Sequence, residues 1–72
     1  MKIIDLGIEM SEQEYRKVLG VIADTDPHLH IVEDIEMYLS GLKPELNEET
    51  VKFLMGSKEG IENILNFLRM DD

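Results

Sequence analysis

The chain contains no cysteine and no tryptophan among its 72 residues. Without cysteine it has no disulfides, thiolate zinc sites or cysteine nucleophiles. Its core must therefore be built from Ile, Leu, Val, Met, Phe and Tyr side chains. The sequence also lacks an apolar run long enough to cross a membrane, and no charged-then-apolar leader opens it. We expect a cytoplasmic protein that does not associate with membranes.

Basic residues are also scarce. Seven Lys and Arg stand against sixteen Asp and Glu, which gives a net charge of −9. This charge disfavours direct binding to nucleic acid. No Lys or Arg occurs between Lys17 and Lys43, so the five acidic residues in that stretch have no local counter-charge. The pattern favours a basic protein partner, although a role of the acids in solubility alone is the plainer interpretation.

The length and composition predict a single small domain over residues 1–72. Hydrophobic residues make up 43% and charged residues 32% of the chain, as is typical of folded proteins. Most of the apolar positions recur with helical spacing. We predict a mainly α fold, a small four-helix bundle with an extended N-terminal arm or strand.

The first ten residues alternate between apolar and other side chains. Ile4, Leu6, Ile8 and Met10 share one parity, which is the period of a half-buried extended segment. A lone strand leaves backbone groups unpaired, so we expect this segment to pack across the helices as an arm. In the alternative interpretation, its edge pairs with another chain. A monomer is favoured, and a homodimer is the second possibility.

Residues 11–14 carry a helix-start signal known as a capping box. The Ser11 hydroxyl can accept from the Glu14 backbone N–H, and the Glu14 carboxylate can accept from the Ser11 N–H. This predicts a helix over about residues 12 to 24. Its apolar stripe is Tyr15, Val18, Leu19 and Ile22.

A second start signal is Asp26 followed by Pro27, which suits the first helical position. This helix should run to about Ser40, because Gly41 suits a left-handed residue after a helix and Pro44 bars continuation. In a competing interpretation, residues 28–31 form a short strand that pairs with the N-terminal segment.

Two shorter helices complete the prediction. Asn47 is expected to cap a third helix that ends at Gly56. Ser57 is expected to cap a fourth helix from Lys58 to about Met70. The apolar face of this last helix is Ile61, Ile64, Leu65 and Leu68.

The sequence offers little for metal or catalytic chemistry. His28 and His30 would diverge on a helix, so they cannot share one metal face. The segment from Asp24 begins like a calcium loop, but Leu29 stands where glycine is needed and Ile35 where a bidentate glutamate is needed. There is no nucleophile–base arrangement, phosphate-binding glycine loop or nucleotide fingerprint. We therefore predict no metal, no cofactor and no enzymatic activity.

The outer face of the second helix is the most informative region. Its inner face is expected to be Val32, Ile35, Tyr38, Leu39 and Leu42, together with Ile31. Met37 lies on the opposite face among carboxylates, an arrangement that resembles the apolar centre and charged rim of a binding surface. Phe53 lies off the apolar stripe of its own helix and is a further candidate contact. The predicted partner-binding residues are Glu33, Asp34, Glu36, Met37, His30 and Phe53.

Two segments resemble the immunity proteins that neutralise colicin-type nucleases. Residues 10–15, followed by Val18, Leu19 and Ile22, are similar to the first helix of that family, and residues 57–63 resemble the start of its last helix. The resemblance implies an acidic second helix that faces a basic enzyme, which here falls on Glu33, Asp34 and Glu36. The paired tyrosines of the family's third helix are absent, so that contact does not carry over.

These observations favour a non-catalytic inhibitor or adaptor. Its acidic face would occupy a basic site on a nuclease or another nucleic-acid-binding protein, as immunity proteins and phage-borne DNA mimics do. The alternative is a small structural or regulatory subunit that dimerises or docks through its N-terminal strand.

Overall fold

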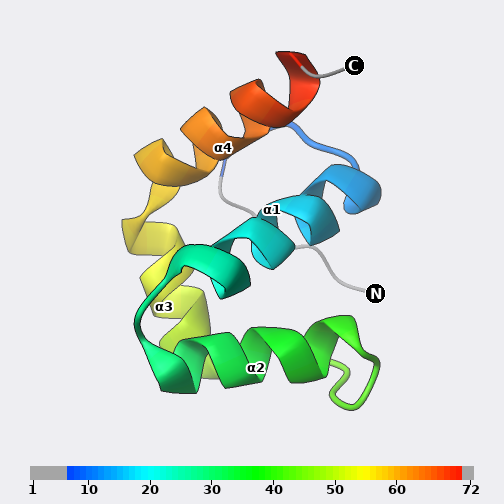
Figure 1. The fold of residues 1–72 in the computed structure, drawn as a ribbon, viewed down its shortest axis with the longest axis vertical. Helices are drawn as coiled ribbons and strands as arrows, with labels where there is room; N and C mark the ends of the chain where they lie inside the picture. The colour runs from blue at the N-terminus through cyan, green and yellow to red at the C-terminus, as the bar shows by residue number, and fades with distance from the viewer. Residues whose placement is uncertain (1–6, 71–72) are drawn as a thin grey trace.

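The computed structural model describes residues 7–70, which form four helices and contain no strand. The mainly α fold is therefore confirmed for these residues. In Figure 1, α4, α1 and α2 lie one above another, and α3 lies across one end. Helix α1 is in contact with both α2 and α4. The helices are α1 (Glu12–Thr25), α2 (Leu29–Leu39), α3 (Glu48–Gly56) and α4 (Lys58–Met70).

The core forms where the apolar stripes of the helices meet. Helix α1 contributes all four residues of its predicted stripe, because its central position buries that face against its neighbours. The rings of Tyr15 and Tyr38 pack edge to face, with centroids 6.4 Å apart. The buried cluster is Tyr15, Val18, Leu19, Ile22, Ile31, Ile35, Tyr38, Leu54, Ile61 and Leu65.

The segment before α1 is described only from residue 7 onwards. Ile8 and Met10 are half-buried and pack against the core. The structure assigns no strand to residues 7–11. Ile4 and Leu6, which carry the first half of the predicted alternation, lie outside the described residues.

The capping box at the start of α1 is confirmed. The Glu14 N–H donates to the Ser11 hydroxyl at 3.1 Å, and the Ser11 N–H donates to the Glu14 carboxylate at 2.9 Å. The same carboxylate accepts from Arg69 Nε at 2.7 Å, which links the start of α1 to the end of α4. The Arg69 guanidinium and the Ser11 N–H together lower the pKa of Glu14 to about 2.

Helix α2 begins later than predicted, at Leu29. Asp26 does not cap the helix. Its carboxylate instead accepts from the backbone N–H of His28 and contacts the His28 ring, both at 2.7 Å. This closes a turn before the helix and leaves His28 as the residue that precedes the first helical turn. Since residues 29–31 are helical, the alternative strand over residues 28–31 is wrong.

The backbone at the end of α2 has the predicted conformation. Gly41 is left-handed, with φ of +86°. Its N–H donates to the Tyr38 carbonyl at 3.2 Å, and the Leu42 N–H donates to the Met37 carbonyl at 2.9 Å. These two bonds form a Schellman motif, which satisfies carbonyls left free at the helix end. The expectation that Leu42 faces the core is wrong, because the chain has already turned away and its side chain is 75% exposed.

The boundaries of α3 and α4 match the sequence signals. Asn47 precedes α3, which ends at Gly56, and Ser57 alone separates α3 from α4. We expected the Asn47 side chain to cap α3, but it does not. Its carbonyl oxygen instead accepts from the Lys43 ammonium.

No helix within residues 7–70 is long and apolar enough to cross a membrane.

Replacing two glycines by alanine should change the free energy of unfolding in opposite directions. Gly41→Ala should lower the free energy of unfolding by about 1 kcal/mol, because a Cβ disfavours the left-handed conformation. Gly20→Ala should raise it by about 0.5 to 1 kcal/mol, because Gly20 lies inside α1 and a Cβ there meets nothing within 4 Å. Urea denaturation of both variants measures the difference. A change of the same sign at both positions would contradict the assigned backbone.

Candidate partner-binding surface

Three of the six predicted site residues lie together on the outer face of α2. Glu33, Glu36 and Met37 are all exposed, and Met37 is 42% accessible. Together with Ser40 and Leu42 they line a shallow depression at the end of the helix. We call this surface, formed by Glu33, Glu36, Met37, Ser40 and Leu42, the Met37–Leu42 patch.

Leu42 is the member of this patch that sequence reasoning missed. The Schellman motif brings the chain back over the last turn of α2, which places Leu42 beside the depression that Met37 lines. Such motifs are frequently accompanied by an apolar contact between these two positions. The signal was therefore present in the spacing of Met37, Gly41 and Leu42. The turn converts one exposed methionine into a two-residue apolar centre.

Asp34 was predicted to lie at the edge of the acidic face, and this is wrong. Its side chain is buried, with only 3% of the residue exposed. One carboxylate oxygen accepts from the Lys43 ammonium, and the other accepts from the Asn47 backbone N–H at 2.7 Å. Burial alone would raise the pKa of Asp34, but these hydrogen bonds outweigh it and lower the pKa. Asp34 thus joins α2 to the start of α3 and is inaccessible to a partner.

His30 lies on the exposed face of α2 but near its other end. Its Nε2 atom is 3.1 Å from the carboxylate of Glu49, in the first turn of α3. Its ring also lies near that of His28, with centroids 6.3 Å apart. Residues seven positions apart on a helix are separated by about 10 Å along its axis, so His30 does not join Met37 in one contact centre.

Phe53 is not an isolated exposed ring. It is half-buried against the core, and its ring lies 5.7 Å from that of His28. It therefore connects α3 to the turn before α2, which explains its position off the apolar stripe. Phe67, on α4, is 68% exposed. The structure does not place either phenylalanine in the Met37–Leu42 patch.

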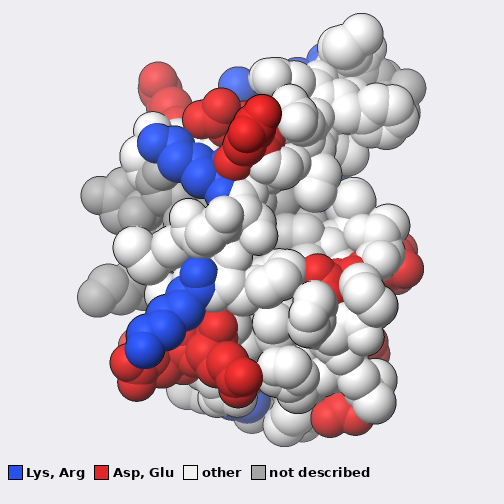
Figure 2. Space-filling view, turned by 90° about the vertical axis from the view of Figure 1, so that its left-hand side faces the viewer, with Lys and Arg blue, Asp and Glu red and all other residues white. Residues whose placement is uncertain are grey.

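Some acidic side chains in the described part of the chain form an ion pair, and others, including Glu33 and Glu36, do not. On the side of the molecule that carries α3, acidic and basic side chains lie next to one another toward the left of the view, whereas the acidic side chains at the right lie among uncharged residues (Figure 2). On α3, Lys52 and Glu48 form an exposed ion pair, with Nζ 3.5 Å from the carboxylate. Glu33 and Glu36 form no ion pair with any residue between 7 and 70. Their charges are therefore available to attract a cation from solution.

The residues considered for metal binding have other contacts. His28 contacts Asp26, and His30 contacts Glu49. Within the described range the structure brings together no group of three or more His, Cys, Asp or Glu side chains suited to a metal ion.

Comparisons with protein-family models, with curated proteins and with solved structures found no match for this chain. The resemblance to nuclease immunity proteins therefore stays a prediction from the sequence.

The buried position of Asp34 predicts how stability depends on pH. Asp34→Asn should lower the free energy of unfolding by about 2 to 4 kcal/mol at pH 7, because Lys43 loses its buried counter-charge. The folded-state pKa lies below that of the unfolded chain, so this stabilisation is present above about pH 4. It is lost as the pH falls through the folded-state pKa. The difference between the variant and the parent should therefore shrink with acidification.

Urea denaturation at a series of pH values measures this difference. Glu33→Gln is the matched control, since Glu33 is exposed on the same helix and should change stability by less than about 0.5 kcal/mol. A difference between Asp34→Asn and the parent that stayed constant down to pH 2 would show that the ion pair does not stabilise the fold.

Proposed function

We propose that this protein is a non-catalytic acidic inhibitor that occupies a basic site on a nuclease or another nucleic-acid-binding protein in the cytoplasm. The observation that carries the proposal is the Met37–Leu42 patch. It combines two unpaired carboxylates with two exposed apolar side chains at one end of α2. A site that binds the phosphate backbone is rich in Lys and Arg, which makes it complementary to such a surface.

The two kinds of side chain have separate tasks in this proposal. Glu33 and Glu36 attract a cationic surface over long range and increase the rate of encounter. Met37 and Leu42 act at short range, because removing their apolar surface from water holds the complex together. The flexible thioether of Met37 can adapt to the shape of the partner.

The net charge of −9 supports a protein partner with a basic surface and opposes direct contact with nucleic acid. The mode of action resembles that of the immunity proteins, in which an acidic second helix faces a basic nuclease. In this chain that role falls on Glu33 and Glu36, because Asp34 is buried against Lys43.

The role of the carboxylates can be tested by reversing their charge. Immobilised protein is used to capture partners from lysate of its source cells, and the nuclease activity of the captured protein is measured with and without this chain. Glu33→Lys/Glu36→Lys should reduce the association rate about tenfold or more and make it less sensitive to salt. Its circular dichroism should be unchanged, because both positions are exposed.

The matched control is Glu59→Lys/Glu62→Lys, which makes the same change in net charge on exposed positions of α4. It should reduce the association rate much less. Equal effects of the two double variants would mean that total charge, and not the face of α2, determines binding. Unchanged binding by the α2 variant would point instead to the N-terminal segment or to the surface near Phe53.

Shortening an apolar side chain of the patch should change the dissociation rate instead of the association rate. Met37→Ala should weaken binding by about 1 to 2 kcal/mol through a faster dissociation rate, with the salt dependence unchanged. Met55→Ala is the matched control, since Met55 is 57% exposed on α3 and lies outside the patch. Surface plasmon resonance separates the two rates. A Met37 variant that changed only the association rate would contradict a short-range contact.

A further inference from the structure

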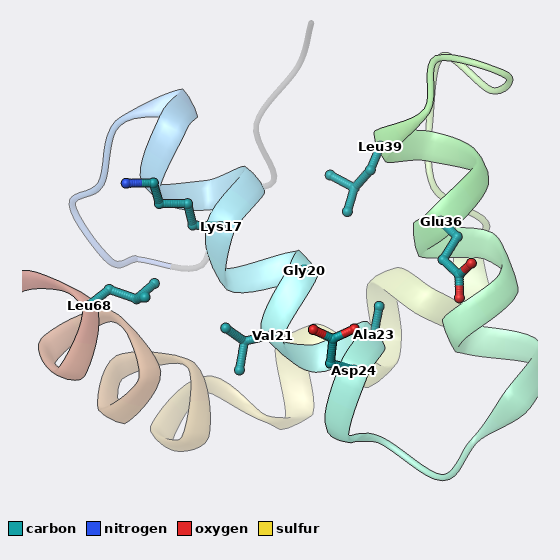
Figure 3. A pocket seen from close by; sticks show the side chains of 8 residues that line it. All are labelled: Lys17, Gly20, Val21, Ala23, Asp24, Glu36, Leu39 and Leu68. Carbon is teal, nitrogen blue, oxygen red and sulfur yellow. The ribbon is translucent and has the colours of Figure 1, made fainter.

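A second surface follows the outer face of α1, where a shallow, open groove runs between α2 and α4 (Figure 3). Helix α1 forms its floor, and one leucine from each neighbouring helix borders it. Met37 and Leu42 do not line this groove, so it is distinct from the Met37–Leu42 patch, although Glu36 lines both. The lining residues are Lys17, Gly20, Val21, Ala23, Asp24, Glu36, Leu39 and Leu68.

The middle of the floor has room for a side chain that this molecule does not supply. A Cβ built at Gly20 would meet no atom within 4 Å. Glycine is less favourable than alanine inside a helix, and no packing within residues 7–70 requires it. Val21, Leu39 and Leu68 are only partly buried around this space. The groove is therefore an apolar surface that a second molecule can cover.

The two ends of the floor carry opposite charges. Lys17 and Asp24 are exposed, and neither forms an ion pair with a residue in the described part of the chain. Seven residues apart, they lie on the same side of α1 and about 10 Å from one another along its axis. They are too far apart to pair with each other. Each is available to a partner of opposite charge.

Opposite charges lie at the two ends of this face, and glycine lies beside valine in its middle. From Lys17 the next positions on the face are Gly20, Val21 and Asp24, and reading back from Asp24 gives the same intervals. A second α1 laid antiparallel across the first would place Lys17 of each copy beside Asp24 of the other. It would also place Val21 of each copy over the open space at Gly20 of the other. Such a self-complementary face is what a two-fold interface requires.

We propose that two copies of this protein associate through the α1 groove as an antiparallel, two-fold symmetric pair. Each copy carries a net charge of −9, so the copies repel one another at long range. The Debye length at physiological salt is about 8 Å, which screens much of this repulsion. The association is therefore reversible and depends on protein concentration. It does not rest on the proposed function.

Charge reversal at the two ends of the floor tests this arrangement. Lys17→Asp places two acids opposite each other, and Asp24→Lys places two bases opposite each other. Each should raise the dimer dissociation constant about tenfold or more, because both symmetric pairs become repulsive. The double variant Lys17→Asp/Asp24→Lys exchanges the charges and should restore the parent dissociation constant. Sedimentation equilibrium from micromolar to millimolar protein measures all four chains.

The net charges of these variants distinguish specific contacts across the interface from repulsion between whole molecules. Lys17→Asp makes the net charge of −9 more negative by two, Asp24→Lys makes it less negative by two, and the double variant leaves it unchanged. If only total charge mattered, Asp24→Lys would dimerise more tightly than the parent. Glu59→Lys makes the same change in net charge on α4, outside the groove, and should not weaken the dimer.

Gly20→Leu supplies an independent steric test. The added side chain enters open space in the single molecule, so the helical circular dichroism should persist. It fills the space that Val21 of the second copy would occupy, so the dimer should be lost. A parent that stays monomeric to millimolar concentration would overturn the proposal. So would a dimer that survives Gly20→Leu, or a charge-exchanged double variant that fails to recover.

Discussion

The ion pair between the buried Asp34 and the half-buried Lys43 fixes the connection from α2 to α3. A carboxylate in the interior is stable only when its charge is matched and its oxygens accept hydrogen bonds. Lys43 supplies the charge, and the Asn47 N–H supplies a further hydrogen bond at the start of α3. The chain between them must turn back toward α2. This turn contains Gly41 and carries Leu42 onto the outer surface, so the candidate site depends on the same ion pair.

Some carboxylates of the described chain are held in contacts within the fold, and others are exposed to solvent without a partner. Asp34 is enclosed, and its charge is used to hold the fold together. Glu14 is also engaged, between the Ser11 N–H and the Arg69 guanidinium that ties α1 to α4. Glu33 and Glu36 remain in solvent without a partner in the described chain. The acidic residues therefore contribute to internal cohesion and also leave unpaired negative charge on the surface.

The central position of α1 explains why the molecule offers two surfaces. Its inner stripe is covered by the other elements, whereas the face that contains Gly20 is left uncovered between α2 and α4. Helix α2 contributes to both surfaces, because its outer face carries Met37 and its flank toward α1 carries Leu39. Glu36 lies between them and lines both. A molecule bound at one surface would therefore alter the electrostatic environment of the other.

The sequence by itself determined the features that depend on a few neighbouring residues. The capping box at Ser11, the left-handed turn at Gly41 and the break at Ser57 involve groups within about one helical turn, so their hydrogen bonds can be read from spacing. The exposure of Glu33, Glu36 and Met37 followed in the same way from helical periodicity.

Only the tertiary structure decided that Asp34 is buried and that Phe53 lies against His28. Both depend on contacts between segments that are separated in the chain. The free energy of these contacts outweighs local conformational preference, and no short sequence motif reports it.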